Sequence, residues 1–275
     1  MFYIGFSFGL AFVEGHQMNY IFIICTENYL PYAKKCLDSL PKNWNFNEYR
    51  IIFKFYNSID LDKIDLGELF HQVQFEAIPY KDWNDQIAYR KAMLLYEFAM
   101  KELKTGDKVI VCDADLKFKI DPFDIFLSNS DVYYTTRHYD YHFPVNEGFW
   151  GFRWNDRTKK FIEFYKEEIE NPTWDPYIRW LKKYWHWGQK NWGIGQDFFC
   201  TIYEYMHVYG ANVSRLILDN DCIFEILGPN YNFCPSVEEN DLERTLDKAT
   251  KEMRWAENNS DVKILHYKGR LKELM

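Results

Sequence analysis

Two aspartates, Asp113 and Asp115, follow a strongly apolar run of the chain. The run Val109-Ile-Val-Cys112 is typical of a strand buried on both faces of a parallel sheet. In extended backbone the spacing i, i+2 puts both carboxylates on one side, where they repel each other unless a cation lies between them or one is protonated. Hard oxygen ligands suit Mg²⁺ or Mn²⁺, which keep open positions for phosphate oxygens. An ordinary Asp-rich loop at a strand end is the alternative interpretation.

Apolar periodicity around this pair predicts alternating strands and helices, and therefore an α/β fold with a central, mostly parallel sheet. The predicted strands are 20–25, 50–56, 73–78, 108–112, 131–136, 146–153 and 263–267, and the predicted helices are 29–40, 83–103, 155–170, one opening at 193–197, and 237–257. Ligands of such sheets lie at the carboxyl ends of the strands, so Thr26 and Tyr29 are expected beside a nucleotide base. Neither GxGxxG nor GxxxxGK[ST] occurs, which argues against a dinucleotide-binding fold and a P-loop.

Length and composition favour one compact domain. The chain has 275 residues, of which 47% are hydrophobic, and no low-complexity linker divides it. We expect an extension at 1–17 and a single domain at 18–275, with a nucleotide-binding half at 18–125 and an acceptor half at 126–275. The net charge of −8, without a basic cluster, argues against a nucleic-acid partner. Composition leaves the oligomeric state open.

Several features bear on the compartment. The apolar stretch 2–13 is too short to span a bilayer and lacks the basic flank of a signal peptide, so no transmembrane segment is expected. The six cysteines form no CxxC pair and lie mostly in apolar runs, which favours buried free thiols in a reducing compartment. We therefore expect a cytoplasmic protein, or one peripheral to a membrane.

Residues 172–192 are rich in tryptophan. The aromatic and imidazole rings of Trp185, His186, Trp187 and Trp192 form either a packed helical face or the wall of a groove for a sugar acceptor, because flat aromatic surfaces stack on sugars as well as fill cores. The helix that follows carries Asp197 in its first turn. A carboxylate is favoured there by the helix dipole, so capping is one interpretation of Asp197.

Taken in order along the chain, these pieces resemble the GT-A fold glycosyltransferases, most closely the retaining family 8, which contains glycogenin and bacterial galactosyltransferases of lipooligosaccharide synthesis. Asp113-Ala114-Asp115 is similar to that family's DxD motif. Tyr89-Arg90 is similar to its phosphate-contacting arginine, and Asn146-x-Gly148 to its "NaGv" element, which touches the donor sugar.

Three further elements of the resemblance lie towards the carboxyl end. Gln196-Asp197 is similar to the "DQD" element and Tyr231-Asn232 to the "YN" strand. The segment His266-Tyr-Lys-Gly-Arg-Leu-Lys272 is similar to the motif HFxGxxKPW. Two positions depart from the pattern: Gly195 stands where the first Asp of "DQD" is expected, and Glu273-Leu274 replaces the closing Pro-Trp.

The resemblance implies a glycosyltransferase that uses a nucleotide sugar, with a UDP-hexose expected, and a glycan or other sugar as acceptor. It implies a metal site made by Asp113, Asp115 and His266, where the imidazole favours Mn²⁺ over Mg²⁺. The donor phosphates would be bound by Arg90, Lys268 and Lys272, with close backbone approach at Gly269. It also implies retention, with Gln196 or Asp197 lining the reacting face and Asn146 holding a donor hydroxyl.

Two other classes remain as alternatives. A phosphatase of the haloacid dehalogenase type also carries DxD after an apolar strand, but Lys117 stands where that fold needs Thr or Val. A non-catalytic protein that binds a carbohydrate or a nucleotide sugar would keep the Trp-rich segment. The combination of Asp113, Asp115 and His266 argues against it.

Overall fold

The computed structural model describes residues 17–42, 44, 47–56, 73–78, 87–137, 143–184, 194–208, 221–235 and 242–275. The strands are β1 (Asn19–Thr26), β2 (Tyr49–Tyr56), β3 (Val73–Ile78), β4 (Lys108–Cys112), β5 (Leu116–Phe118), β6 (Val132–Thr136), β7 (Val145–Arg153), β8 (Phe224–Leu227) and β9 (Ile264–His266). The α-helices are α1 (Leu30–Asp38), α2 (Ile87–Glu102), α3 (Asp156–Glu170), α4 (Asp175–Tyr184), α5 (Ile194–Tyr203) and α7 (Leu242–Asn258). Short 3₁₀ helices occupy Glu27–Tyr29, Pro122–Leu127, Pro229–Tyr231 and Gly269–Leu274.

In this part of the chain, seven strands form one sheet in the order β3-β2-β1-β4-β7-β6-β8. β1 pairs in parallel with both β2 and β4, β2 pairs in parallel with β3, and β6 pairs in parallel with β8. Only β7 runs against its neighbours β4 and β6. The predicted α/β fold with a central, mostly parallel sheet is therefore confirmed, and β4 lies at its centre.

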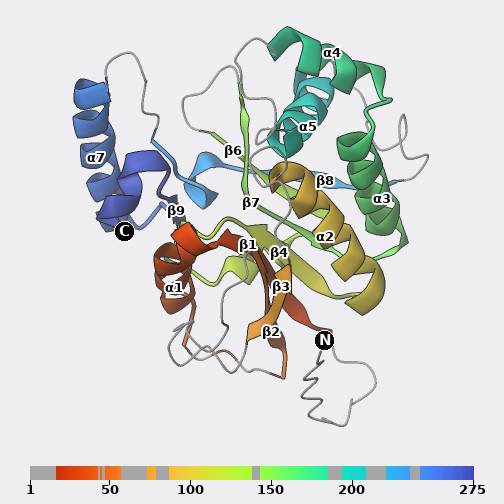
Figure 1. Ribbon diagram of the computed structural model, residues 1–275, viewed down its shortest axis with the longest axis horizontal. Helices are drawn as coiled ribbons and strands as arrows, with labels where there is room; N and C mark the ends of the chain where they lie inside the picture. Colours follow the sequence, from red (N-terminus) through yellow and green to blue (C-terminus); the bar gives the residue numbers. More distant parts are fainter. Residues whose placement is uncertain are drawn as a thin grey trace.

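Helices cover both faces of this sheet (Figure 1). On one face α2, α3 and α5 pack together, and their apolar side chains join those of Phe22, Val109 and Trp150 in one core cluster. On the other face α1 and the Pro122–Leu127 turn cover a second cluster, which includes Ile23 and Ile110. Alternate residues of β1 and β4 thus enter opposite cores, which explains why both strands are continuously apolar.

A second, two-stranded sheet connects the end of the chain to the Asp pair. β5 follows Asp115 directly and pairs antiparallel with β9, so that Leu116 is opposite His266. The backbone N–H of Tyr267 donates to the carbonyl oxygen of Asp115 at 3.0 Å. α7 packs on this pair through its own apolar cluster, which includes Met253 and Tyr267. This arrangement brings a residue of the last strand beside the carboxylates of the central strand.

Most predicted elements are present, with shifted ends. β3 has the predicted bounds, and α2 covers Ile87–Glu102 of the predicted helix 83–103, of which residues 83–86 lie outside the described residues. The short strand β8 was not predicted, whereas α4 lies in the Trp-rich segment for which a packed helical face was one of the two interpretations. All six cysteines are free thiols, and all but Cys234 are buried, as expected.

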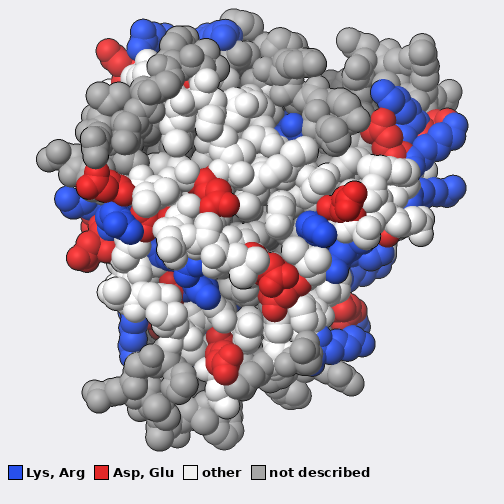
Figure 2. All heavy atoms as spheres, turned by 180° about the vertical axis from the view of Figure 1, so that it is seen from behind, with Lys and Arg blue, Asp and Glu red and all other residues white. Residues whose placement is uncertain are grey.

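The surface carries mixed charge. On the face seen in Figure 2, basic and acidic side chains are interspersed rather than separated. On α7 the pairs Lys248–Glu252 and Lys251–Asp247 are spaced i, i+4. Within the described ranges, no helix combines the length and the apolar character needed to cross a bilayer.

Candidate active site

The backbone of the Asp pair is fixed from two sides. β4 ends at Cys112, and the N–H of Asp113 donates to the carbonyl oxygen of Gly148 in β7 at 2.9 Å. The carbonyl oxygen of Asp115 is bound by the segment that follows β9. Both carboxylates therefore leave a short, anchored turn at the carboxyl end of β4, where ligands of α/β sheets bind.

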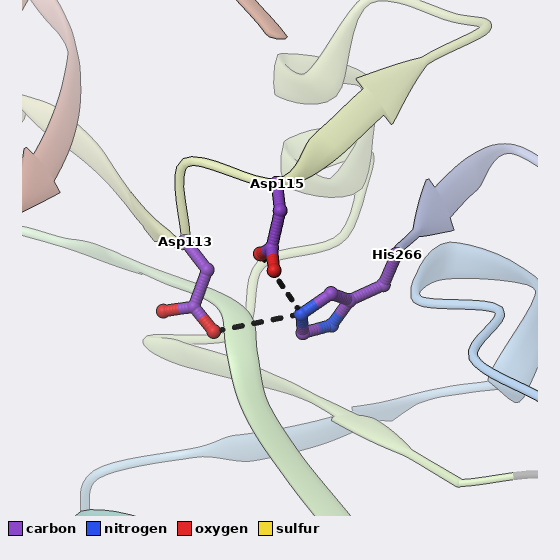
Figure 3. A group of neighbouring side chains, drawn as sticks. All are labelled: Asp113, Asp115 and His266. Carbon is purple, nitrogen blue, oxygen red and sulfur yellow. Dashed lines mark ion pairs between the residues drawn. The ribbon is translucent and has the colours of Figure 1, made fainter. Parts of the chain in front are cut away.

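The side chains of Asp113, Asp115 and His266 converge (Figure 3). His266 Nε2 lies 3.2 Å from Asp115 Oδ1 and 3.6 Å from Asp113 Oδ2, and one potential ligand atom from each residue lies within 4.8 Å of the others. His266 and Asp115 are buried, whereas the side chain of Asp113 is 39% exposed. Two carboxylates and one imidazole form a donor set that fits Mn²⁺ or Mg²⁺, with an open side for substrate.

The second ring nitrogen of His266 shows how the imidazole is held. Nδ1 lies 2.9 Å from Oδ1 of Asn232, a carbonyl oxygen that only accepts, and 3.3 Å from the amide nitrogen of Asn146, so we assign the proton to Nδ1 on the shorter contact. The amide nitrogen of Asn232 donates to Thr135 Oγ1 at 2.9 Å, which fixes this amide orientation. The lone pair of Nε2 then faces two carboxylates, an arrangement that a cation between them stabilises. Hydrogen bonding of the distal nitrogen is also how ligand histidines are usually oriented.

Gly148 gives His266 its space. A Cβ atom at this position would lie 2.3 Å from His266 Cε1 and 2.9 Å from Asp113 Oδ2. The neighbouring Asn146 accepts from the Gly148 N–H at 3.1 Å, and its Nδ2 lies 3.3 Å from His266 Nδ1. The Asn146-x-Gly148 element predicted to touch the donor therefore also borders the cluster.

Lys91 of α2 is buried and pairs with the carboxylate of Asp113. Its ammonium lies 3.1 Å from Asp113 Oδ1, which leaves Oδ2 directed towards His266. Burial alone would raise the pKa of Asp113, but the positive charges of Lys91 and Lys268 hold it well below its usual value. Asp113 is thus ionised at neutral pH and available as a ligand.

Lys272 and Tyr29 join the other side of the cluster. Lys272 Nζ lies 3.3 Å from Asp115 Oδ2, sits 3.8 Å from the centre of the Tyr29 ring and donates to the Tyr29 hydroxyl. Lys268 lies nearby, and burial together with the charge of Arg137 lowers its pKa, partly offset by Asp113 and Asp115. Gly269 has φ +55, in the left-handed region that favours glycine, and this conformation opens the last 3₁₀ turn. Predicted phosphate and base ligands from both ends of the chain therefore meet at the Asp pair.

The first turn of α5 borders this region. The carboxylate of Asp197 accepts from the indole N–H of Trp180 at 3.2 Å, and burial raises its pKa to about 7. The Gln196 Oε1 atom accepts from Arg137 at 2.7 Å. Gly195 faces the carboxylate of Glu147. These residues are held by specific partners, but in the described part of the chain no hydrogen bond or ion pair joins Asp197 or Gln196 to Asp113, Asp115 or His266.

The remaining predicted residues are placed less directly. Arg90 is half-buried and, among the described residues, makes no hydrogen bond or ion pair to the cluster. Thr26 ends β1, where its carbonyl oxygen accepts from the Cys25 thiol, and Ala114 is buried between the two aspartates. The proposed acceptor residues Trp185, His186, Trp187 and Trp192 lie outside the described residues. In the described part of the Trp-rich segment, Trp180 of α4 is a core residue and Trp174, in the turn before it, is half-buried against Phe198, which fits a packed helical face.

Sequence reasoning missed Lys91 and Glu147. Lys91 lies within the predicted helix 83–103, where its spacing does not distinguish a solvated lysine from a buried one, and its burial depends on contacts between α2 and β7. Glu147 is the middle residue of Asn146-x-Gly148, a position to which the motif assigns no role. An acidic residue within an otherwise apolar strand is the signal that could have identified it.

The fold and the cluster together define a class of protein: an α/β protein that gathers two carboxylates, an imidazole and lysines at the carboxyl end of its central strand. Residues 68–251 match the family model of the nucleotide-diphospho-sugar transferases. The chain therefore belongs to this family and is a glycosyltransferase. No curated protein matches the sequence.

Several solved glycosyltransferase structures have a fold similar to that of this chain. A glycosyltransferase involved in glycosylation of the major capsid of PBCV-1 is 13% identical with a TM-score of 0.53, covering 94% of this chain and 98% of its own. Mouse xyloside xylosyltransferase 1 is 14% identical with a TM-score of 0.51, covering 92% and 99%. The galactosyltransferase LgtC, solved with donor and acceptor sugar analogues, is 13% identical with a TM-score of 0.50, covering 92% and 87%. The expected GT-A fold is confirmed.

Proposed function

We propose that this glycosyltransferase is metal-dependent and moves a hexose from a UDP-sugar to a sugar or glycan acceptor, with retention of anomeric configuration. The observation that carries the proposal is the convergence of Asp113, Asp115 and His266 Nε2 within 4.8 Å at the carboxyl end of β4. Lys272, which pairs with Asp115, and Tyr29, whose ring lies against Lys272, would extend this site towards a nucleotide.

In this proposal Asp113 Oδ2, a carboxylate oxygen of Asp115 and His266 Nε2 hold Mn²⁺ or Mg²⁺. When bound, the ion supplies a positive charge that stabilises the diphosphate as it leaves. Asn232 keeps the His266 proton on Nδ1, and Lys91 keeps Asp113 ionised. Each of these contacts exists before the ligands bind, so little reorganisation is needed.

The lysines of the last turn act on the phosphates. Lys272, which now contacts Asp115, would exchange that contact for one with a phosphate oxygen. Lys268, which is partly buried near the positive charge of Arg137, gains a compensating negative charge from the phosphates. Tyr29 and Thr26 flank the base. Arg90 is retained as a further phosphate ligand on the strength of the family motif alone.

Transfer breaks the bond between the anomeric carbon and the phosphate oxygen and forms a bond from the acceptor oxygen on the same face. The acceptor proton passes to the leaving phosphate, so the protein need only stabilise charge and position the sugar. Gln196, Asp197 and Asn146 are proposed to line that face. Their partners Arg137 and Trp180 fix the first two.

Trp185, His186, Trp187 and Trp192 are proposed as the acceptor wall, on the sequence alone. Residues 18–275 are proposed as one domain with its nucleotide-binding half at 18–125. The free thiols fit a cytoplasmic location, which we also propose.

Thermal shift with UDP alone, Mn²⁺ alone and both together tests the proposal. Ligands of the folded state raise its apparent stability, so the pair should stabilise the protein more than the sum of the two single additions. A screen of UDP- and GDP-sugars for slow hydrolysis then identifies the donor, and NMR of the first product gives its anomeric configuration. Indifference to UDP in the presence of Mn²⁺, or full turnover in EDTA, would contradict the proposal.

A further inference from the structure

Glu147 is a buried acid in the middle of β7, between Asn146 and Gly148. Successive side chains of a strand point to opposite faces, so Glu147 faces α2, α3 and α5 while its neighbours border His266. Its Oε1 accepts from the Tyr165 hydroxyl at 2.9 Å and lies 3.9 Å from Lys91 Nζ. The residue is 7% exposed.

The carboxylate of Glu147 fills the space above Gly195. A Cβ atom at Gly195 would lie 2.3 Å from Oε1 and 2.4 Å from Oε2 of Glu147. Gly195 does not have a positive φ, so its backbone does not require glycine. The absence of a side chain at this position is therefore explained by the Glu147 carboxylate, and the two positions cannot both carry an acid in this arrangement.

Glu147 is also linked to the metal cluster. The same ammonium of Lys91 contacts Asp113 Oδ1 at 3.1 Å and Glu147 Oε1, so the two carboxylates flank one cation. On its other side Glu147 raises the pKa of Asp197, together with the larger effect of burial. The carboxylate thus lies between Asp113, which borders the diphosphate, and the first turn of α5, which is proposed to border the reacting sugar.

A second buried acid shows what a purely structural glutamate looks like in this protein. Both oxygens of Glu168 are used: Oε1 accepts from Thr173 Oγ1 at 2.6 Å, and Oε2 accepts from the N–H groups of Thr173 and Trp174 at 2.9 Å. Glu147 differs. Among the described residues no hydrogen bond to its Oε2 is found, although both carboxylate oxygens lie against Gly195 at the start of α5.

We propose that Glu147 binds the hydroxyls of the donor sugar and supplies from β7 the carboxylate that Gly195 lacks in α5. The inference rests on the proposed function, since it assumes a sugar joined to the diphosphate at the Asp pair. Oε2 accepts a hydrogen bond from a ring hydroxyl, and Oε1 keeps Tyr165 and Lys91 as partners. The position of the acid then contributes to the choice of donor sugar.

The test separates the sugar from the nucleotide. The affinities of UDP and of the UDP-sugar found in the screen are measured by calorimetry with Mn²⁺, and their ratio gives the contribution of the sugar. Glu147→Gln should reduce the affinity for the UDP-sugar, or its turnover where hydrolysis intervenes, by about tenfold to hundredfold, the loss of a charge-assisted hydrogen bond. The affinity for UDP should change less than threefold.

A rescue variant and a matched control complete the design. Glu147→Ala should reduce the ratio of the UDP-sugar affinity to the UDP affinity. Glu147→Ala combined with Gly195→Asp should raise that ratio again at least tenfold, because the acid is returned to the same space from α5. Glu168→Gln should lower the melting temperature and leave the ratio of affinities unchanged.

The outcomes are distinct. If wild-type protein does not bind UDP with Mn²⁺, the proposed function fails, and this inference fails with it. If wild type binds UDP and favours the UDP-sugar, but Glu147→Gln keeps that preference, only the inference is overturned. A parallel loss of UDP and UDP-sugar affinity in Glu147→Gln would likewise overturn it, since Glu147 would then act through Lys91 on the cluster.

Discussion

Replacing Asn232 by leucine should weaken the metal site without removing any of its three proposed ligands. The carbonyl oxygen of Asn232 accepts from His266 Nδ1 at 2.9 Å, and both residues are 1% exposed. Leucine has a similar shape but no acceptor. The Nδ1–H would be left buried and unpaired, so the imidazole would move its proton to Nε2 and donate to Asp115, which lies 3.2 Å away.

The magnitude follows from that change of tautomer. To bind a cation, His266 must return the proton to Nδ1 and leave it without a partner, at a cost of about 1–3 kcal/mol for an unsatisfied buried donor. Such a cost corresponds to a Kd for Mn²⁺ about five to 150 times higher. Competition between free and bound Mn²⁺, followed by electron paramagnetic resonance, measures this directly and needs no donor sugar.

Two controls separate the tautomer from general damage. Asn232→Asp keeps an oxygen acceptor and should retain Mn²⁺ binding, whereas Thr135→Val removes the partner of the Asn232 amide nitrogen while leaving the acceptor in place. ¹⁵N chemical shifts of His266 report the protonated nitrogen. Unchanged Mn²⁺ affinity in Asn232→Leu, or a wild-type His266 protonated at Nε2, would refute the reasoning.

Three further predictions concern the same site. Lys272→Ala should weaken UDP by about 1.5–3 kcal/mol while uridine binding stays nearly constant, which calorimetry with both ligands checks. Equal losses would assign Lys272 to the fold. Gly148→Ala should reduce Mn²⁺ affinity at least tenfold, because its Cβ would displace His266, whereas Gly228→Ala, with nothing within 4 Å, should leave it unchanged. For Asp197, burial raises the pKa from 3.8 to about 7. The folded state therefore binds the proton more tightly than the unfolded state, so this residue reduces stability progressively as the pH rises from 4 to 7. Melting temperatures of wild type and Asp197→Asn should diverge over that window in favour of the variant, and parallel curves would show that the carboxyl titrates normally.

The sequence was sufficient for those parts of the fold whose signal is local. β1 and β4 are continuously apolar because both faces of each strand are buried, and such a run can be recognised without a partner. β8 was not predicted because it has only four residues, three of them half-buried. Its pairing with β6 identifies it as a strand in the structure. An edge strand of that length carries little pattern of its own.

The site divides in the same way. Asp113 and Asp115 are two residues apart in the chain, so their spacing alone suggests a cation site. His266 was added to that site because its motif resembles one of a known family. The contacts of Lys91 and Glu147 join α2 to β7, and Gly195 meets Glu147 only when α5 packs on the sheet. Such encounters are products of tertiary packing, and no spacing along the chain encodes them.

The pairing of β5 with β9 also sets an order of assembly. During synthesis the two aspartates emerge long before His266 and the lysines that follow it, and β5 has no partner until β9 has been made. A nascent chain therefore carries two of the three proposed metal ligands without the imidazole, Lys268 or Lys272. Such a chain should fold much of its sheet before the proposed metal site can form, so the site is completed only when the last strand has been made.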